Sequence, residues 1–142
     1  MEASTLIDVE NKVIDTLSKA FDGTASVSSV FIESPSEFPW VYAREISNTG
    51  YSRSYDNALR EHHARVTFRV EYYSALSKGA KQEVKALMQV GDACMQGMKF
   101  RRTGYGLIPN WDRSITRGYA DYTAVVGEPR EEGDDTVYQI YR

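Results

Sequence analysis

Residues 62–73 read His-His-Ala-Arg-Val-Thr-Phe-Arg-Val-Glu-Tyr-Tyr, and they decide the fold. Apolar and polar side chains alternate strictly along this stretch. Because successive side chains of a strand point to opposite faces of its sheet, this period of two predicts one packed face and one polar face. The predicted packed face consists of Ala64, Val66, Phe68, Val70 and Tyr72, and the predicted polar face of Arg65, Thr67, Arg69 and Glu71.

Two amphipathic helices are predicted, one before and one after this strand. Residues 5–21 and 78–98 repeat apolar side chains at the three-and-four spacing of a single helical face. Asp22-Gly23 offers a glycine C-cap for the first helix, and Ser77 is expected to cap the second.

Shorter stretches predict the remaining strands, at 26–33, 40–46, 100–107, 115–126 and 136–141. The expected order is therefore a helix, about three strands, a second helix and three more strands. Grouped strands of this kind predict an α+β fold. We expect residues 1–142 to form a single domain, with an antiparallel or mixed β-sheet, two main helices packed on one face, and a long loop or hairpin extension.

Two polar segments are predicted to be loops. Residues 47–61 contain Gly, Ser, Tyr and Arg without periodicity and are expected to form a long exposed loop. Residues 128–135 are predicted to form an acidic loop. Long loops in a compact domain usually have a function or lack order, so both segments are candidates for contact with a partner.

The composition excludes several classes of protein. The formal net charge of −3 argues against a general nucleic-acid binder, which needs a basic face. The single cysteine, Cys94, cannot form an internal disulfide and fits a reducing compartment. The acidic N-terminus does not resemble a secretory signal, and no stretch is apolar enough to span a membrane. We therefore expect a soluble protein in the cytosol with no membrane partner.

A search for chemistry predicts that the chain is not an enzyme and has no cofactor or metal. His62 and His63 are neighbours on a strand and would point to opposite faces, so they are poorly placed to share a metal ion. Cys94 lies on the apolar stripe of a helix, where burial hides a thiol. Gly104 and Gly106 lack the sequence context of a phosphate-binding loop.

Arginine is prominent, and it outnumbers lysine in the sequence. Its planar guanidinium pairs with carboxylates and stacks on aromatic rings, so it is favoured at protein interfaces. The acidic loop of a second copy is one candidate partner, while an ordinary solvated sheet face is an equally good interpretation. The candidate oligomer or partner interface comprises Tyr51, Arg53, Tyr55, Arg65, Arg69, Arg101, Arg102, Arg117, Glu131, Glu132, Asp134 and Asp135.

Residues 98–104, Met-Lys-Phe-Arg-Arg-Thr-Gly, and residues 111–126, which end in Arg-Gly-Tyr-Ala-Asp-Tyr-Thr-Ala-Val-Val, carry a family resemblance. Together they resemble the C-terminal half of the tail terminator (tail completion) proteins of long-tailed phages, often labelled minor capsid proteins. The strand Ala64–Tyr73, the helix after it and the leading helix also fit that family.

The resemblance implies a structural virion protein without catalysis. Tail terminators form a ring, usually a hexamer, that caps the tail tube, stops its polymerisation and joins the tail to the head. The implied partners are other copies of the chain, the tail tube protein and a head–tail connector or stopper. DNA would pass through the ring without specific binding. The implied location is the head-proximal end of the virion tail, after assembly in the host cytoplasm.

Other functions remain open at this stage. The chain could be a different head–tail connector or stopper, or a tail tube protein. In a different class, it could be a small hydrolase that uses His62 or His63 with Asp56 or Glu61. It could also be a cytosolic ligand-binding domain that uses its Tyr-rich loop, which would predict a monomer or dimer.

Overall fold

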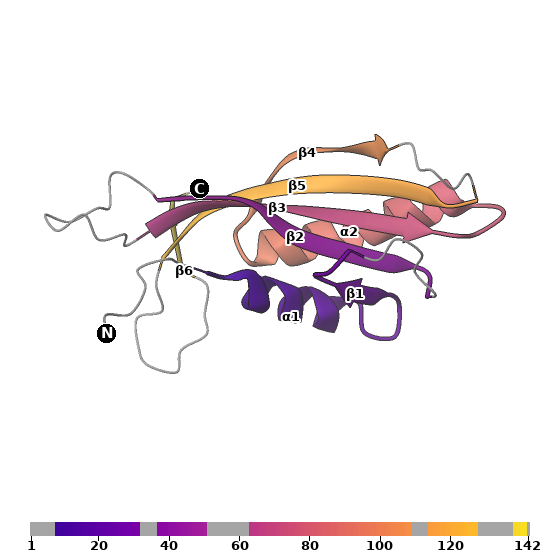
Figure 1. Ribbon diagram of the computed structural model, residues 1–142, viewed down its shortest axis with the longest axis horizontal. Helices are drawn as coiled ribbons and strands as arrows, with labels where there is room; N and C mark the ends of the chain where they lie inside the picture. The colour runs from indigo at the N-terminus through magenta and orange to yellow at the C-terminus, as the bar shows by residue number, and fades with distance from the viewer. Residues whose placement is uncertain (1–7, 32–36, 51–62, 109–113, 128–137, 142) are drawn as a thin grey trace, which may run out of the picture.

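The computed structural model in Figure 1 describes residues 8–31, 37–50, 63–108, 114–127 and 138–141. The order is a helix, three strands, a second helix and three strands, which confirms the predicted α+β class. The elements are α1 (Glu10–Ala20), β1 (Ser26–Ser28), β2 (Trp40–Gly50), β3 (His63–Ser74), α2 (Ala80–Gly97), β4 (Arg101–Ile108), β5 (Thr116–Gly127) and β6 (Tyr138–Tyr141).

All six of these strands belong to one mixed sheet. The order across the sheet is β1-β2-β3-β5-β4, and β6 also pairs with β5. Strands β1 and β2 are parallel, whereas every other pair is antiparallel. Within the described residues, β1 and β4 are therefore the two edges, and β3 lies at the centre.

The central strand β3 confirms the predicted packed face. Ala64, Val66, Phe68, Val70 and Tyr72 are all fully buried. They face the helices, which lie together on one side of the sheet (Figure 1). Each such large apolar side chain contributes about 1.5–3 kcal/mol when it is removed from water, so this face provides much of the core.

The helices add the second layer of the core. From α1 and the residue after it, Val13, Leu17 and Phe21 are fully buried. Gly23 has a φ of 75°, a left-handed conformation that glycine adopts without strain, and it follows the end of α1 as predicted.

The start of α2 differs from the prediction. Gly79, with a φ of 77°, precedes the first helical residue, and no side chain caps the helix. The expectation that Ser77 would cap it is therefore wrong. Residues 1–7, including the predicted start of the first helix, lie outside the described residues.

Two strand boundaries also differ from the sequence prediction. The predicted loop 47–61 overlaps β2, because Ser47–Gly50 pair with Ala64–Thr67 of β3 beyond a register shift after Glu45. These residues are polar, yet they are ordered by pairing with β3. Residues 51–61 lie outside the described part of the chain, as does the acidic loop 128–135.

Strand β1 is shorter than the predicted strand 26–33. The Ser28 hydroxyl lies 2.8 Å from the Val30 carbonyl oxygen, to which it donates, and 3.0 Å from the Val30 amide nitrogen, whose N–H it accepts. This local bonding replaces a sheet ladder and ends the strand. Neither described helix has the length and apolar content of a membrane-spanning helix.

Candidate partner-binding surface

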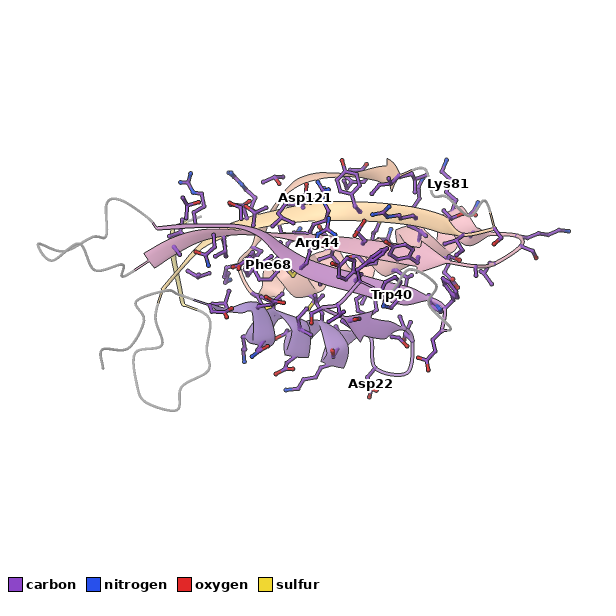
Figure 2. The ribbon with its side chains drawn as sticks, viewed as in Figure 1. Asp22, Trp40, Arg44, Phe68, Lys81 and Asp121 are labelled. Carbon is purple, nitrogen blue, oxygen red and sulfur yellow. The ribbon has the colours of Figure 1, made fainter. Side chains whose placement is uncertain are left out.

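The sheet face opposite the helices carries a band of charged side chains across β2, β3 and β5. The strand register brings them together, since Arg44 lies opposite Arg69, and Arg69 lies opposite Asp121. Figure 2 labels Arg44 and Asp121 on neighbouring parts of the sheet. We call this set the charged band, which consists of Arg44, Arg69, Glu71, Arg117 and Asp121.

One half of the charged band is a two-pronged ion pair between β3 and β5. Arg69 Nε lies 2.8 Å from Asp121 Oδ1, and Arg69 Nη2 lies 3.0 Å from Asp121 Oδ2. The guanidinium also lies over the ring of Tyr119, 4.8 Å from its centroid. The hydrogen bonds to Asp121 raise the pKa of Arg69, so the cation is fixed in place.

The other half centres on a buried carboxylate. Arg117 Nε donates to Glu71 Oε1 over 2.8 Å, and Arg117 Nη2 donates to the same oxygen. Arg44 Nη1 lies 3.5 Å from Glu71 Oε2, an ion pair without a hydrogen bond. Only 1% of the Glu71 side chain is exposed. The alternation placed Glu71 on the correct face, but this carboxylate is buried there, so the interpretation of the polar face as an ordinary solvated surface does not hold at Glu71.

An aromatic cluster covers Glu71. Trp40 and Tyr42 stack with ring centroids 5.7 Å apart, and Tyr73 lies 4.7 Å from Trp40. All three are buried, and burial raises the pKa of Tyr73 to about 12. Phe31 packs on Trp40 and Tyr42 at 6.4 and 5.8 Å but stays 54% exposed. The charged band therefore borders an exposed apolar surface.

Asp92 organises a second polar cluster, on the helix side of β4. It accepts hydrogen bonds from Arg102 Nη1 (3.0 Å), Tyr122 OH (3.1 Å) and Gln96 Nε2 (2.7 Å). Burial raises the pKa of Tyr122. A hollow of about 280 Å³ lies beside the cluster and is lined in part by Lys85. The cluster joins α2 to β4 and β5.

The start of β4 is a basic corner of the molecule. A hollow of about 380 Å³ lies there, between the end of α2 and the first residues of β4. Its lining includes Lys99, Arg101 and Arg102, all of which are exposed. Arg102 also lies over the ring of Tyr105, 5.1 Å from its centroid. This corner offers positive charge to an acidic partner.

The predicted interface residues fall into separate groups. Arg69 and Arg117 lie together in the charged band, and Arg101 and Arg102 lie at the β4 edge. Arg65 is exposed further along β3. The other predicted residues lie outside the described part of the chain: Tyr51, Arg53, Tyr55, Glu131, Glu132, Asp134 and Asp135.

Three of the predicted arginines already have acidic partners within their own chain. Arg69 pairs with Asp121, Arg102 with Asp92 and Arg117 with Glu71. The sequence analysis placed Glu71 on the polar face but identified none of these pairings, and it did not predict Phe31 as a surface residue. The signal for part of the surface was present, because Trp40, Tyr42 and Arg44 occur at the spacing of one strand face.

Other chemistry is sparse on the described residues. Among them, no group of three His, Cys, Asp or Glu side chains is close enough to hold a metal ion. Cys94 is half-buried, and burial raises the pKa of its thiol. It lines a groove of about 900 Å³ between α1 and α2.

A scan against protein-family models and a search of curated proteins found no match to this chain. The arrangement of side chains therefore provides the grounds for a functional proposal.

Proposed function

We propose that the chain is a structural subunit of the tail terminator type, which forms a ring on the end of a phage tail tube. In this role it stops tube polymerisation and presents the surface to which the head connector docks. The ring would contain several copies, six in the usual arrangement implied by the resemblance. DNA would pass through without specific binding.

The observation that most supports this proposal is the sheet face opposite the helices. There, the partly exposed guanidinium groups of Arg44 and Arg69 lie on the same face as the exposed aromatic side chain of Phe31. Protein interfaces favour arginine and aromatic residues for their combination of pairing and apolar area. A face of this composition suits contact with another protein.

The element order gives further support. A leading helix, a polar stretch after the second strand, the long strand β3, the helix α2 and the strands β4 and β5 follow one another as the resemblance implies. A tail tube subunit is the closest alternative, because it would also bind copies of itself. The two differ in outcome, since a tube subunit polymerises without limit and a terminator stops at one ring.

The decisive experiment adds the purified chain to growing tail tubes. Light scattering gives the solution mass, and negative-stain imaging shows whether rings form and whether tubes carry a cap. We expect tubes grown with the chain to be capped and unable to elongate after fresh tube protein is added. Continued elongation, together with an uncapped tube end, would contradict the proposal.

A further inference from the structure

The two edges of the sheet carry opposite charge. The β1 edge, taken as residues 8–31 and 37–39 and including α1, has more carboxylates than lysines. It holds Asp8, Glu10, Asp15, Asp22 and Glu37 against Lys12 and Lys19. We call it the acidic edge.

The opposite side, taken as residues 78–108 and including α2 and β4, has an excess of cations. It holds Lys78, Lys81, Lys85, Lys99, Arg101 and Arg102 against Glu83 and Asp92. We call it the basic edge. Figure 2 shows Asp22 and Lys81 on opposite sides of the molecule. All six cations and four of the five carboxylates of the acidic edge are exposed.

Both edge strands have a free side among the described residues. Strand β4 pairs with β5 alone, and β1 pairs with β2 alone. An unpaired strand edge presents a row of backbone donors and acceptors that another strand can satisfy. Proteins often protect such edges with proline, charged side chains or a β-bulge; β4 has no proline, and its arginines and its register shift between Arg102 and Gly104 lie at its start, before Tyr105–Ile108.

Strand direction makes the two edges compatible. Strand β1 runs parallel to β2, and each further step, from β2 to β3, β5 and β4, reverses the direction. Strands β1 and β4 therefore run antiparallel. A second copy placed beside the first in the same orientation brings its β1 antiparallel to β4, the more stable type of pairing.

Exposed apolar side chains lie where such a neighbour would cover them. Tyr105 is 63% exposed and Leu107 is 44% exposed. They lie opposite Ala120 and Gly118 of β5, on the face that carries the helices, but α2 does not cover them. In a joined sheet, α1 of the next copy lies on this same face, because α1 packs over β1 and β2.

We propose that the acidic edge of one copy docks on the basic edge of the next, with β1 beside β4. The occupant of the β4 edge is a second copy, since the chain itself carries the complementary charge and the antiparallel strand. Such a contact is head-to-tail and joins unlike surfaces, so it can repeat and close into a ring. The inference deepens the proposed function and rests on it.

The test alters the charge of one edge at a time in the full chain. Lys85→Glu with Arg101→Glu changes the net charge of the basic edge from +4 to zero, and Asp15→Lys with Asp22→Lys changes that of the acidic edge from −3 to +1. Among the described residues, the structure shows no ion pair for these four side chains. We expect each variant alone to associate at least about tenfold more weakly than the unaltered chain, as measured by light scattering, with unchanged thermal unfolding.

Mixing the two variants is the critical step. The unaltered acidic edge of one variant then meets the unaltered basic edge of the other, so we expect 1:1 assemblies to form, with their composition read by native mass spectrometry. Ala75→Glu with Ser77→Glu, at two exposed positions in the turn after β3, is the control for added negative charge and is expected to associate normally. Variants that associate normally alone, or a mixture that fails to recover, would overturn the edge contact.

The outcomes separate this inference from the proposed function. Rings of either variant that cap tubes despite the altered edge keep the function and remove the edge contact. Open chains or dimers that show recovery on mixing keep the edge contact and remove the ring. An unaltered chain that stays monomeric, both alone at high concentration and beside tail tubes, overturns both.

Discussion

Gly91 of α2 lies directly against the hydroxyl of Tyr72 on β3. A Cβ atom added at Gly91 would lie 1.9 Å from the Tyr72 oxygen and 2.9 Å from Cζ. Both residues are buried, and Tyr72 belongs to the main hydrophobic core. The glycine therefore sets how closely the helix approaches the centre of the sheet.

This contact predicts that Gly91→Ala destabilises the protein by about 1–3 kcal/mol, the usual cost of overpacking. The substitution loses stability although alanine is the better helix former. Gly97 is the matched control, because nothing lies within 4 Å of its added Cβ. Gly97→Ala should be neutral or stabilising by up to about 1 kcal/mol. Urea unfolding of both variants measures the difference, and equal effects would contradict the prediction.

The buried carboxylate of Glu71 predicts a strong dependence on Arg117. Arg117→Met leaves a charge in the interior with Arg44 as its one remaining ion-pair partner among the described residues, so we expect a loss of about 3 kcal/mol. Arg69→Met should cost only about 1 kcal/mol, because its ion pair is more exposed. Adding Glu71→Gln to Arg117→Met should restore part of the stability. Denaturant midpoints test this order, and a larger loss in the Arg69 variant would refute it.

The raised pKa of Tyr73 predicts that the protein loses stability in alkaline solution. Burial raises its pKa to about 12 in the folded protein, against about 10 in the unfolded chain. Between these values the unfolded chain binds fewer protons than the folded protein, so the free energy of unfolding falls as pH rises. The stabilisation is complete below about pH 10. In Tyr73→Phe the decline from about pH 10 to 12 should be shallower, and an unchanged slope would contradict the assignment.

Local periodicity was sufficient to predict the fold class and the packed face of β3. The alternation around Phe68 and the helical spacing around Val84 predicted which side chains are buried, and the observed burial follows both patterns. The end of β2 could not be predicted from the sequence. Ser47–Gly50 are polar and have little preference for strands of their own, and they are ordered by pairing with β3.

The candidate surface could be predicted only in part. Arg69 and Arg117 were predicted as interface residues from the prominence of arginine in the sequence and, for Arg69, from its place on the polar face of its strand. Their partners Asp121 and Glu71 are 52 and 46 residues away in the chain, so only the strand register reveals them. The same limit applies to the opposite charges of the two edges, since sequence order does not show that β1 and β4 end up at the two sides of one sheet.

Arg101 and Arg102 are neighbours in the sequence but should respond differently to charge reversal. Arg102 pairs with Asp92 and lies over Tyr105, so Arg102→Glu places a carboxylate beside Asp92 and should lower stability as well as assembly. Arg101 is exposed and has no ion-pair partner among the described residues. Arg101→Glu should therefore leave thermal unfolding unchanged and weaken self-association alone. Paired measurements of melting temperature and solution mass test this separation. Equal losses of stability in the two variants would show that the Asp92 contact contributes little, and normal association of Arg101→Glu would place the β4 edge outside any interface between copies.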